Sequence, residues 1–272
     1  MKILVTAAVT LAMTAGAAWA AGECAQGNTL TDGKLTIATG NPAYFPWVID
    51  DAPESKQGFE AAVAYAVAER MGFADGDVVW VRTSFDQAIQ PGAKNFDLNM
   101  QQYSITEDRD KVVDFSEPYY SAAMAAVIRV SASKGMGPDT TSLSLLAWGA
   151  DANTTAVGMI NDLIKPEKSP FLYGDNADVV AALNANQIDA ALFDLPTALY
   201  LAAVVLDDGM VIGQFPADRS ENPDRFGILM EEGSALKPCV DAALAALKGD
   251  GTLAAIEAKW LQETTDVPII EE

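Results

Sequence analysis

A single arginine, Arg109, lies among four acidic residues in the stretch TEDRDKVVD. Thr106 and the acids that follow it predict the start of a short helix, because a hydroxyl cap and negative charge favour the first helical turn. A cation in that turn runs against the helix dipole, so Arg109 either forms a surface ion pair with Glu107 or Asp114 or has a binding function. A planar guanidinium can hold a carboxylate through two parallel hydrogen bonds.

Two further groups have the chemistry to complete such a site. Asp194 ends the segment IDAALFD, where a carboxylate at the carboxyl end of a strand could hold an ammonium group, although it could equally cap a helix that begins directly after it. Asn153, Thr154 and Thr155 precede a predicted helix, and their hydroxyl and free N–H groups favour an anion or serve only as a cap. A guanidinium that binds a carboxylate and a carboxylate that binds an ammonium group are the minimum needed to bind a zwitterion.

Aromatic residues could supply the walls of this site. The loop NPAYFPW places Tyr44, Phe45 and Trp47 after the first predicted strand, and Phe59 opens the next predicted helix. Aromatic rings could enclose a ligand side chain. Core packing is the alternative, and we expect it for at least one of Phe45 and Trp47.

The composition excludes several kinds of chemistry. The 272 residues contain no histidine, which removes the commonest general base and most zinc sites, and no nucleophile or nucleotide motif is present. A carboxylate pair could act in acid–base catalysis, but among 38 acids a pair is uninformative. The net charge of −21 argues against nucleic acid as a partner. We therefore expect no cofactor, no metal and no catalytic residue.

The first 20 residues have the pattern of a secretion signal: a short basic start, an apolar run and small residues before a predicted cleavage after Ala20. A membrane anchor is the alternative, but the apolar run is short for one. A lipoprotein is disfavoured because Glu23 precedes Cys24. Export to an oxidising compartment predicts a disulfide between Cys24 and Cys239, which would bring the start of the mature chain next to a helix near its end.

Predicted strands and helices alternate along the chain, and this alternation favours mostly parallel sheets covered by helices. In the first part, strands are expected at 33–40, 77–82 and 96–102, and helices at 58–73 and 84–90. The pattern then restarts, with strands expected at 122–130, 143–151, 188–194, 210–215 and 224–230 and helices at 154–164, 176–187, 234–248 and 251–262.

The fold class that follows is α/β with two lobes, the second inserted into the first, because the predicted disulfide ties the last helices to the first unit. We expect lobe 1 at 21–121 and 226–272, lobe 2 at 122–225, and two crossing hinge segments near 120–125 and 220–227. The cleft between the lobes, where strand carboxyl ends meet, is the expected ligand site. A hinge there would let the cleft close.

Several stretches resemble the extracytoplasmic solute-binding proteins of polar amino-acid ABC importers, known as bacterial solute-binding protein family 3, which have the type II periplasmic-binding-protein fold. The most specific is SITEDRDKVVDFSEPYY, which is similar to the family's arginine-containing FS-x-PY signature. In the family's order there also occur GKLTIATGNPAYFPW, GFEAAVAYAVAERMGF, QIDAALFDLPTALY and GTLAAIEAKWL. The resemblance covers nearly the whole mature chain.

The resemblance implies a set of ligand-binding residues: Arg109, Asp194, Ser104, Gln102, Gln101, Tyr44, Phe59, Asn41, Thr154 and Thr155. Arg109 would hold the ligand α-carboxylate with the help of the hydroxyl residues, and Asp194 would hold the α-ammonium. The two glutamines would complete the cage, and the two aromatic residues would flank the ligand side chain.

Two positions depart from the family's pattern. Asn41 stands where relatives that bind basic or amide side chains often have an acid, which disfavours a strongly cationic ligand. Asn153 replaces the glycine that usually precedes the threonine pair.

The function that the resemblance implies is that of a monomeric periplasmic receptor, not an enzyme, which delivers an amino acid to an ABC permease/ATPase complex at the inner membrane. Two alternatives stay open. One is an exported enzyme similar to cyclohexadienyl dehydratase, for which the sequence offers no identifiable general acid. The other is a solute sensor without a role in transport.

Overall fold

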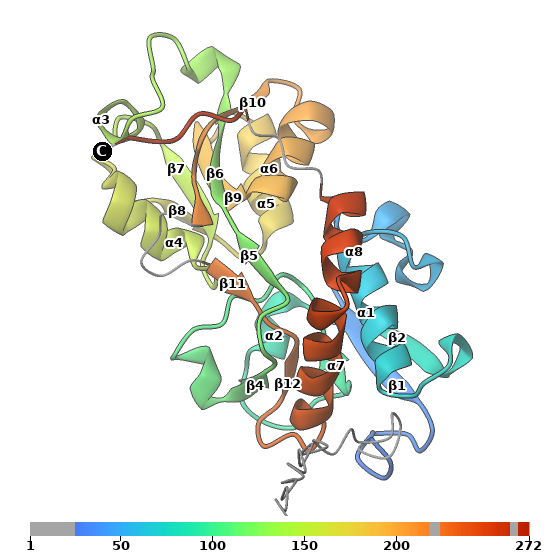
Figure 1. The fold of residues 1–272 in the computed structure, drawn as a ribbon. Helices are drawn as coiled ribbons and strands as arrows, with labels where there is room; N and C mark the ends of the chain where they lie inside the picture. Colours follow the sequence, from blue (N-terminus) through green and yellow to red (C-terminus); the bar gives the residue numbers. More distant parts are fainter. Residues whose placement is uncertain (1–24, 218–223, 262–265, 272) are drawn as a thin grey trace, which may run out of the picture.

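The computed structural model describes residues 25–217, 224–261 and 266–271. These residues form two lobes, each built on a five-stranded sheet, with a two-stranded ribbon between them (Figure 1). The predicted signal peptide and Cys24 lie outside the described residues, so the predicted disulfide of Cys239 stays a prediction. Within the described part of the chain, no helix combines the length and the apolar character needed to cross a membrane.

Lobe 1 contains a mixed sheet with helices packed on it. Its strands, in spatial order, are β2 (Val78–Arg82), β1 (Leu35–Thr39), β3 (Leu98–Asn99), β12 (Leu229–Glu231) and β4 (Val113–Phe115). The first three run parallel, and β12 is antiparallel to both of its neighbours. Three helices pack against one another beside this sheet: α1 (Phe59–Arg70), α7 (Lys237–Gly249) and α8 (Thr252–Trp260) (Figure 1). The short helix α2 (Phe85–Ala88) follows β2.

The start of α1 is fixed to the aromatic loop that precedes it. Gly58 has a φ of 103°, and a Cβ atom there would lie 2.4 Å from the carbonyl oxygen of Trp47. This close approach lets that carbonyl accept hydrogen bonds from the backbone N–H groups of Glu60 (3.0 Å) and Ala61 (3.3 Å). The loop thus satisfies helix N–H groups that have no partner within the helix.

Lobe 2 is built on a second mixed sheet. Its strands, in spatial order, are β10 (Gly209–Phe215), β6 (Met124–Arg129), β9 (Ala190–Asp194), β7 (Trp148–Asp151) and β8 (Phe171–Tyr173). The helices are α3 (Thr140–Leu143), α4 (Ala156–Met159), α5 (Asn176–Asn184) and α6 (Leu195–Tyr200), with π-helical turns after α4 (Ile160–Ile164) and α6 (Leu201–Val205). Successive residues of β6 belong to different cores, because side chains alternate across a strand, so the lobe has one apolar core on each face of its sheet.

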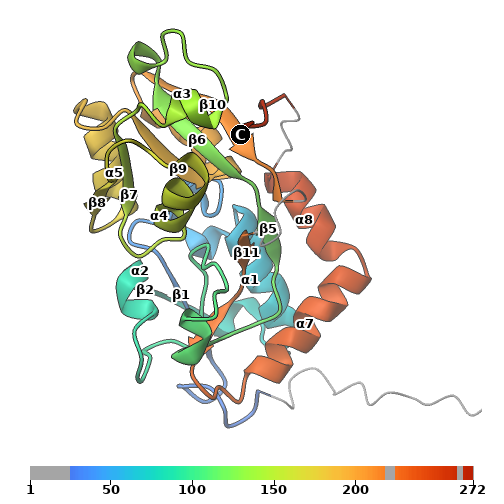
Figure 2. The same cartoon turned by 90° about the vertical axis from the view of Figure 1, so that its left-hand side faces the viewer.

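The ribbon between the lobes consists of β5 (Tyr120–Ala122) and β11 (Asp224–Phe226), which pair antiparallel. Both strands run between the lobes (Figure 2); β5 lies within the first predicted hinge segment and β11 within the described part of the second, whose residues 220–223 lie outside the described residues. The rings of Tyr120 and Phe226 pack edge-on against Trp47, with centroids 5.6 and 5.7 Å from its ring. The aromatic loop of lobe 1 is therefore in direct contact with the hinge.

The sequence-based prediction of elements is wrong in two respects. The segment 143–151 is not one strand, because Leu143 is the last residue of α3 and only Trp148–Asp151 is extended. The side chain of Asp139 caps α3 by accepting a hydrogen bond from Ser142 N (2.8 Å). The segment 224–230 is divided into β11 and β12 at Gly227, where a Cβ atom would lie 2.9 Å from the side chain of Ile105. The strands predicted at 33–40, 77–82 and 96–102 are parallel, as expected, and each sheet also contains one strand antiparallel to its neighbours, β12 in lobe 1 and β6 in lobe 2.

The last described residues, expected in lobe 1, instead pack on lobe 2. The backbone N–H of Ile270 donates to Gln214 O (2.9 Å), and Gln214 N–H donates to Pro268 O (2.8 Å), so the tail lies along the edge of β10. The Ile270 side chain is 6% exposed and belongs to the lobe 2 core. Since α8 packs on α1 in lobe 1, the described segments that precede and follow residues 262–265 contact different lobes.

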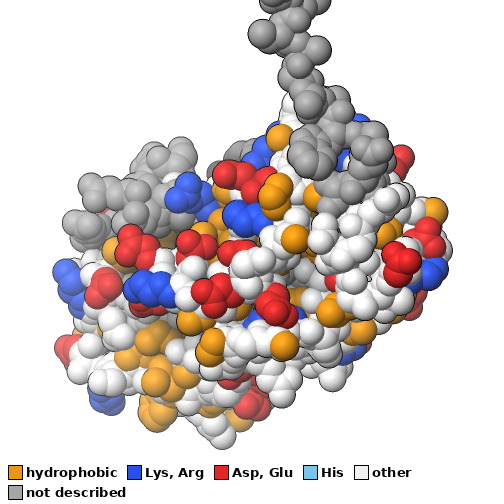
Figure 3. Space-filling view, turned by 90° about the horizontal axis from the view of Figure 1, so that it is seen from below, with side chains coloured by type: hydrophobic (Ala, Val, Ile, Leu, Met, Phe, Trp, Pro, Cys, Tyr) orange, Lys and Arg blue, Asp and Glu red, His pale blue; other side chains and the backbone are white. Residues whose placement is uncertain are grey.

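The charged side chains are mixed on the face of the molecule seen from below. There, lysine and arginine side chains lie among aspartate and glutamate side chains (Figure 3). On this face the acidic side chains therefore have basic neighbours.

Candidate ligand-binding cleft

A cleft between the lobes encloses about 1080 Å³ of empty space, part of which is open to solvent. Nine of the ten predicted binding residues line it: Asn41, Tyr44, Gln101, Gln102, Ser104, Arg109, Thr154, Thr155 and Asp194. Its floor on lobe 2 is formed where β7 and β9 end, which agrees with the general location of ligands at strand carboxyl ends.

The tenth predicted residue, Phe59, does not reach the cleft. It is fully buried in the lobe 1 core, with its ring centroid 5.8 Å from Trp47 and 6.1 Å from Tyr119. The reason is the orientation of α1, whose first side chain points into the sheet while the next one, Glu60, lines the cleft. Phe85, which the sequence did not single out, is an aromatic residue that lines the cleft.

Arg109 lies at the base of the cleft and is only 9% exposed. One terminal nitrogen donates to Ser104 O (2.8 Å) and the other to Asn153 O on lobe 2 (2.6 Å), while the guanidinium carbon lies 5.2 Å from the centroid of the Phe85 ring. Burial lowers the pKa of Arg109 and the carboxylate of Asp224 opposes that change, but a guanidinium stays charged at physiological pH.

The surface ion-pair explanation for Arg109 does not hold. No ion pair of Arg109 occurs among the described residues; Asp114 accepts instead from Ser234 N (2.8 Å), and the adjacent Asp108 pairs with Lys111 at 2.7 Å. Arg109 turns away from these acids and towards the lobe interface.

The hinge strand β11 contributes a carboxylate that the sequence analysis missed. Thr155 Oγ1 donates to Asp224 Oδ2 (3.0 Å), and Ser104 Oγ lies 3.4 Å from Thr155 Oγ1. Burial raises the pKa of Asp224, while hydrogen bonds from these two hydroxyls lower it. The hydroxyls expected to help hold a ligand carboxylate therefore bond to Asp224 in this structure.

Asp194 caps a helix and also lines the cleft. Its Oδ1 accepts from Thr197 N (2.8 Å) and thereby caps α6, and its side chain also lines the cleft. Burial raises the pKa of Asp194 to about 6, although hydrogen bonds from Thr197 oppose the shift. The group is thus poised to gain from a cationic partner.

The two glutamines are occupied by protein partners. Gln102 N donates to Glu60 Oε1 (2.8 Å), and the Gln102 amide and Tyr119 OH also donate to the Glu60 carboxylate. Gln101 donates to Asn99 Oδ1 (3.2 Å). Burial raises the pKa of Glu60 to about 7, and the hydrogen bonds of Tyr119 and Gln102 oppose that shift.

Aromatic residues of the loop 41–47 connect the lobes. Trp47 is fully buried, as expected for at least one of the loop aromatics, and its indole N–H donates to Thr197 Oγ1 of α6 (2.8 Å). The ring of Phe45 packs against Tyr200 with centroids 4.6 Å apart. Tyr44 lines the cleft, where burial and then the charge of Asp175 raise the pKa of its hydroxyl.

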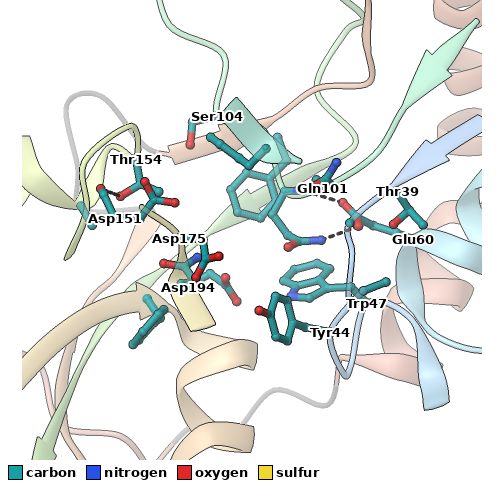
Figure 4. A pocket seen from close by; sticks show the side chains of 18 of the residues that line it. Thr39, Tyr44, Trp47, Glu60, Gln101, Ser104, Asp151, Thr154, Asp175 and Asp194 are labelled. Carbon is teal, nitrogen blue, oxygen red and sulfur yellow. Dashed lines mark hydrogen bonds between the residues drawn. The ribbon is translucent and has the colours of Figure 1, made fainter. Parts of the chain in front are cut away.

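Three carboxylates gather on the lobe 2 side of the cleft, opposite Tyr44 and Trp47 (Figure 4). Asp194 ends β9, Asp151 ends β7, and Asp175 caps α5 just after β8. The latter two are not distinguished in the sequence, because among 38 acids nothing but their position at strand ends marks them. In the described part of the chain, no group of three or more acids or cysteines is arranged to hold a metal ion.

The fold and the cleft define the class of protein: a two-lobed solute-binding protein whose ligand site lies between hinged lobes. Comparison with known families agrees, because residues 35–263 match the family described as bacterial extracellular solute-binding proteins, family 3. The chain belongs to this family.

Individual relatives share most of their length with this chain. An arginine-binding periplasmic protein of Mannheimia haemolytica is 25% identical over 244 residues, which cover 86% of this chain and 94% of the relative. The solved structure of an amino acid ABC transporter substrate-binding protein from Streptococcus pneumoniae, bound to L-arginine, has 26% identity and a TM-score of 0.66, covering 84% of this chain and 93% of that one. An ancestral amino acid-binding protein described as a precursor of cyclohexadienyl dehydratase has 25% identity and a TM-score of 0.67, covering 85% and 96%.

Proposed function

We propose that this protein is the periplasmic receptor of an ABC importer, that it closes its two lobes on an amino acid, and that it delivers this amino acid to a membrane permease. Family membership and the amino-acid ligand of relatives support the proposal. The observation that carries it is that Arg109 of lobe 1 and Asp194 of lobe 2 line the same cleft. Opposite charges on opposite walls fit the α-carboxylate and α-ammonium groups of one ligand.

Ligand binding would replace some of the hydrogen bonds that the residues lining the cleft now form with one another. The ligand carboxylate would take up Arg109 and the hydroxyls of Thr155 and Ser104, in place of contacts that these groups now make with protein oxygens. Thr154 would add backbone or hydroxyl contacts from lobe 2, while Asn41, Tyr44 and the two cleft glutamines would form the wall on lobe 1. Because the contacts come from both lobes, ligand binding would favour the closed form.

Calorimetric titration of the ligand-free protein with each of the twenty amino acids tests the proposal. The protein must first be unfolded, dialysed and refolded to remove a co-purified ligand. We expect saturable binding of at least one amino acid. If a refolded, cooperatively unfolding protein binds none of them, the proposed function is wrong.

Several further features belong to this proposal. We propose export with cleavage after Ala20, a Cys24–Cys239 disulfide and a monomeric receptor, with lobe boundaries near 121 and 226 except for the tail 266–271 on lobe 2. Mass spectrometry of the mature protein with and without reductant measures the cleavage site and the disulfide together.

An enzymatic elimination is the second candidate function, favoured by one observation. Glu60, whose pKa burial raises to about 7, lines the cleft and is the kind of general acid that dehydration of a cyclic carboxylate needs. Against this role, its oxygens already accept from Gln102 and Tyr119. Incubation with prephenate or arogenate distinguishes the functions: aromatic product that disappears in Glu60→Gln would establish the enzyme, and its absence together with amino-acid binding supports the receptor.

A further inference from the structure

Asp224, on the hinge strand β11, occupies the hydroxyl groups that the proposed ligand carboxylate needs. Thr155 Oγ1 donates to Asp224 Oδ2 (3.0 Å), and the Ser104 hydroxyl also bonds to this carboxylate. Ser104 belongs to lobe 1 and Thr155 to lobe 2, so Asp224 bonds to both lobes at this end of the cleft. A serine or threonine hydroxyl has one hydrogen to donate. Neither hydroxyl can therefore donate to Asp224 and to a ligand carboxylate at the same time.

The positive charge of Arg109 is also shared before a ligand enters. Burial raises the pKa of Asp224 and that of Asp151, and the guanidinium charge of Arg109 opposes both shifts. Arg109 thus acts as a counter-charge to two carboxylates. Among the described residues that line the cleft, it is the only arginine or lysine. A ligand carboxylate would therefore be the third anion around one cation.

The remaining neighbours of Asp224 do not compensate for its charge. Its partner on β5 is the uncharged Ala122, and the next residue of its own strand, Arg225, is exposed on the opposite face. Burial raises the pKa of Asp194, and the charge of Asp224 adds to that shift, so the acid facing Asp224 is itself repelled by it. The ligand ammonium would balance Asp194. Two further carboxylates that compete for the same donors cannot both stay ionised in a partly desolvated site without a large cost.

Resting on the proposed function, we propose that Asp224 takes up one proton from solvent when an amino acid binds, and that its new O–H group donates a hydrogen bond to the ligand α-carboxylate. The hydroxyls of Thr155 and Ser104 turn from Asp224 to the ligand, and the carboxyl group becomes a further donor beside them. Arg109 then faces two anions, as it does in the ligand-free protein. Asp224 is thus a ligand-contact residue that recognises the carboxylate through its proton.

Calorimetric titration in two buffers of different ionisation enthalpy counts the protons taken up, because each proton drawn from the buffer adds that enthalpy to the measured heat. The probe is the tightest binder among the twenty L-amino acids. At pH about 7.5, Asp194, whose pKa is about 6, is already ionised and contributes little. We expect uptake of about 0.5 to 1 proton per amino acid bound, and an affinity that falls about three- to tenfold per pH unit above pH about 7.

The decarboxylated amine of the same amino acid is the matched control ligand. It has no carboxylate to accept the new hydrogen bond, so its binding should take up fewer than about 0.2 protons. Wild-type protein that binds the amino acid without proton uptake, or that takes up as many protons with the amine, would overturn the role of Asp224 and leave the proposed function intact. Binding of no amino acid would overturn both.

Asp224→Asn assigns the proton to this residue. The amide can donate to the ligand carboxylate without titrating, so uptake should fall below about 0.2 protons and the loss of affinity above pH about 7 should disappear. A residue that only stabilised the fold would leave uptake and the pH profile as in wild type. Asp162→Asn, which removes an exposed lobe 2 carboxylate outside the cleft lining, is the control and should keep the full uptake.

A folded Asp224→Asn variant that binds the amino acid and still takes up the proton would exclude the proposal. Because the comparison of the amino acid with its amine uses wild-type protein, a variant that fails to fold leaves the test decisive.

Discussion

The two walls of the cleft differ in how completely the protein satisfies their polar groups. On lobe 1, Glu60 accepts from Gln102 and Tyr119, and Arg109 donates to Ser104 O within the same lobe. On lobe 2, Asp151 and Asp194 each accept a backbone N–H at one oxygen and present the remainder to the cleft. The polar groups of the lobe 1 wall are therefore bonded mainly to one another, while the carboxylates of lobe 2 keep oxygens that a ligand could reach.

The interfaces that join these walls depend on few contacts. Arg109 donates to Asn153 O at 2.6 Å, and Trp47 donates to Thr197 Oγ1 at 2.8 Å, so each is a lobe 1 donor on a lobe 2 acceptor. Substitutions of Arg109 and Trp47 can therefore distinguish effects on ligand contacts from effects on the closure of the two lobes.

The largest effect is expected for Arg109→Ala. Without the guanidinium a ligand carboxylate would be buried unpaired, and the contact to Asn153 O would be lost as well. We expect amino-acid affinity to fall by roughly 100-fold or more, with partial recovery in Arg109→Lys, which keeps the charge but loses the planar fork. Calorimetry measures both. Lys111→Ala, which removes an exposed cation two residues away, is the control; wild-type affinity in Arg109→Ala would contradict the assignment.

Removal of the charge on the opposite wall is expected to cost somewhat less. In Asp194→Asn the amide can still accept from Thr197 N and cap α6, but it no longer balances an ammonium group. Affinity should drop about 10- to 100-fold, as for other charge-assisted hydrogen bonds, with little change in thermal stability. A matched carboxylate at another cap, Asp139 of α3, provides the control as Asp139→Asn. Unchanged affinity in Asp194→Asn would refute the ammonium site.

A smaller effect is expected at the contact between the aromatic loop and α6. Trp47→Phe removes the donor to Thr197 while keeping an aromatic ring against Tyr120 and Phe226. Loss of one inter-lobe hydrogen bond should speed ligand dissociation about three- to tenfold. Stopped-flow dissociation kinetics measure this rate. Trp80→Phe removes an indole donor whose partner, Tyr65, lies in the same lobe, and an equal change in that control would show that the effect is not one of closure.

The smallest predicted effect is a dependence of stability and affinity on pH in opposite directions. Burial raises the pKa of Glu60 from 4.5 to about 7 and that of Asp194 from 3.8 to about 6. Between the ordinary and the raised values the folded protein binds more protons than the unfolded chain, so the free energy of unfolding falls as the pH rises from about 5 to about 8. Ligand affinity should rise through pH about 6, because the ammonium needs ionised Asp194.

Thermal unfolding and calorimetry across this range measure the two trends. Glu60→Gln should flatten the fall in stability above pH about 6, because the group that loses its proton there is then absent. Carboxyl groups whose pKa is lowered, such as those of Asp77 and Asp250, lose their stabilising effect only at lower pH, as they become protonated. A melting temperature of the ligand-free protein that rises steadily from pH about 5 to 8 would contradict the account.

Much of the fold could be predicted from the sequence because its signals are local. The helices α1, α7 and α8 and the apolar strands β1 and β6 follow from the spacing of apolar residues. Periodicity could not show that residues 224–230 contain two strands that belong to different sheets, or that the last described residues pair with the edge of β10. Both features depend on contacts between segments that are distant in the sequence.

Some residues of the candidate site could likewise be predicted from local signals, and others could not. Arg109 and Asp194 could be found because a cation in an acidic turn and an acid at the end of an apolar strand conflict with their local surroundings. Asp151, Asp175 and Asp224 could not, because each is one acid among many until the fold brings it to the cleft. Phe59 was misassigned because one position along α1 changes which face a side chain occupies.

The most direct test of the central claim uses the tightest-binding amino acid and two analogues, one without the α-carboxylate and one without the α-amine. The claim that Arg109 and Asp194 hold the two ends of a zwitterion predicts that wild type binds each analogue at least about 30-fold more weakly by calorimetry. It also predicts that Arg109→Ala no longer distinguishes the des-carboxy analogue from the parent, and Asp194→Asn no longer distinguishes the des-amino one. Wild-type binding of either analogue with the affinity of the parent would contradict the claim.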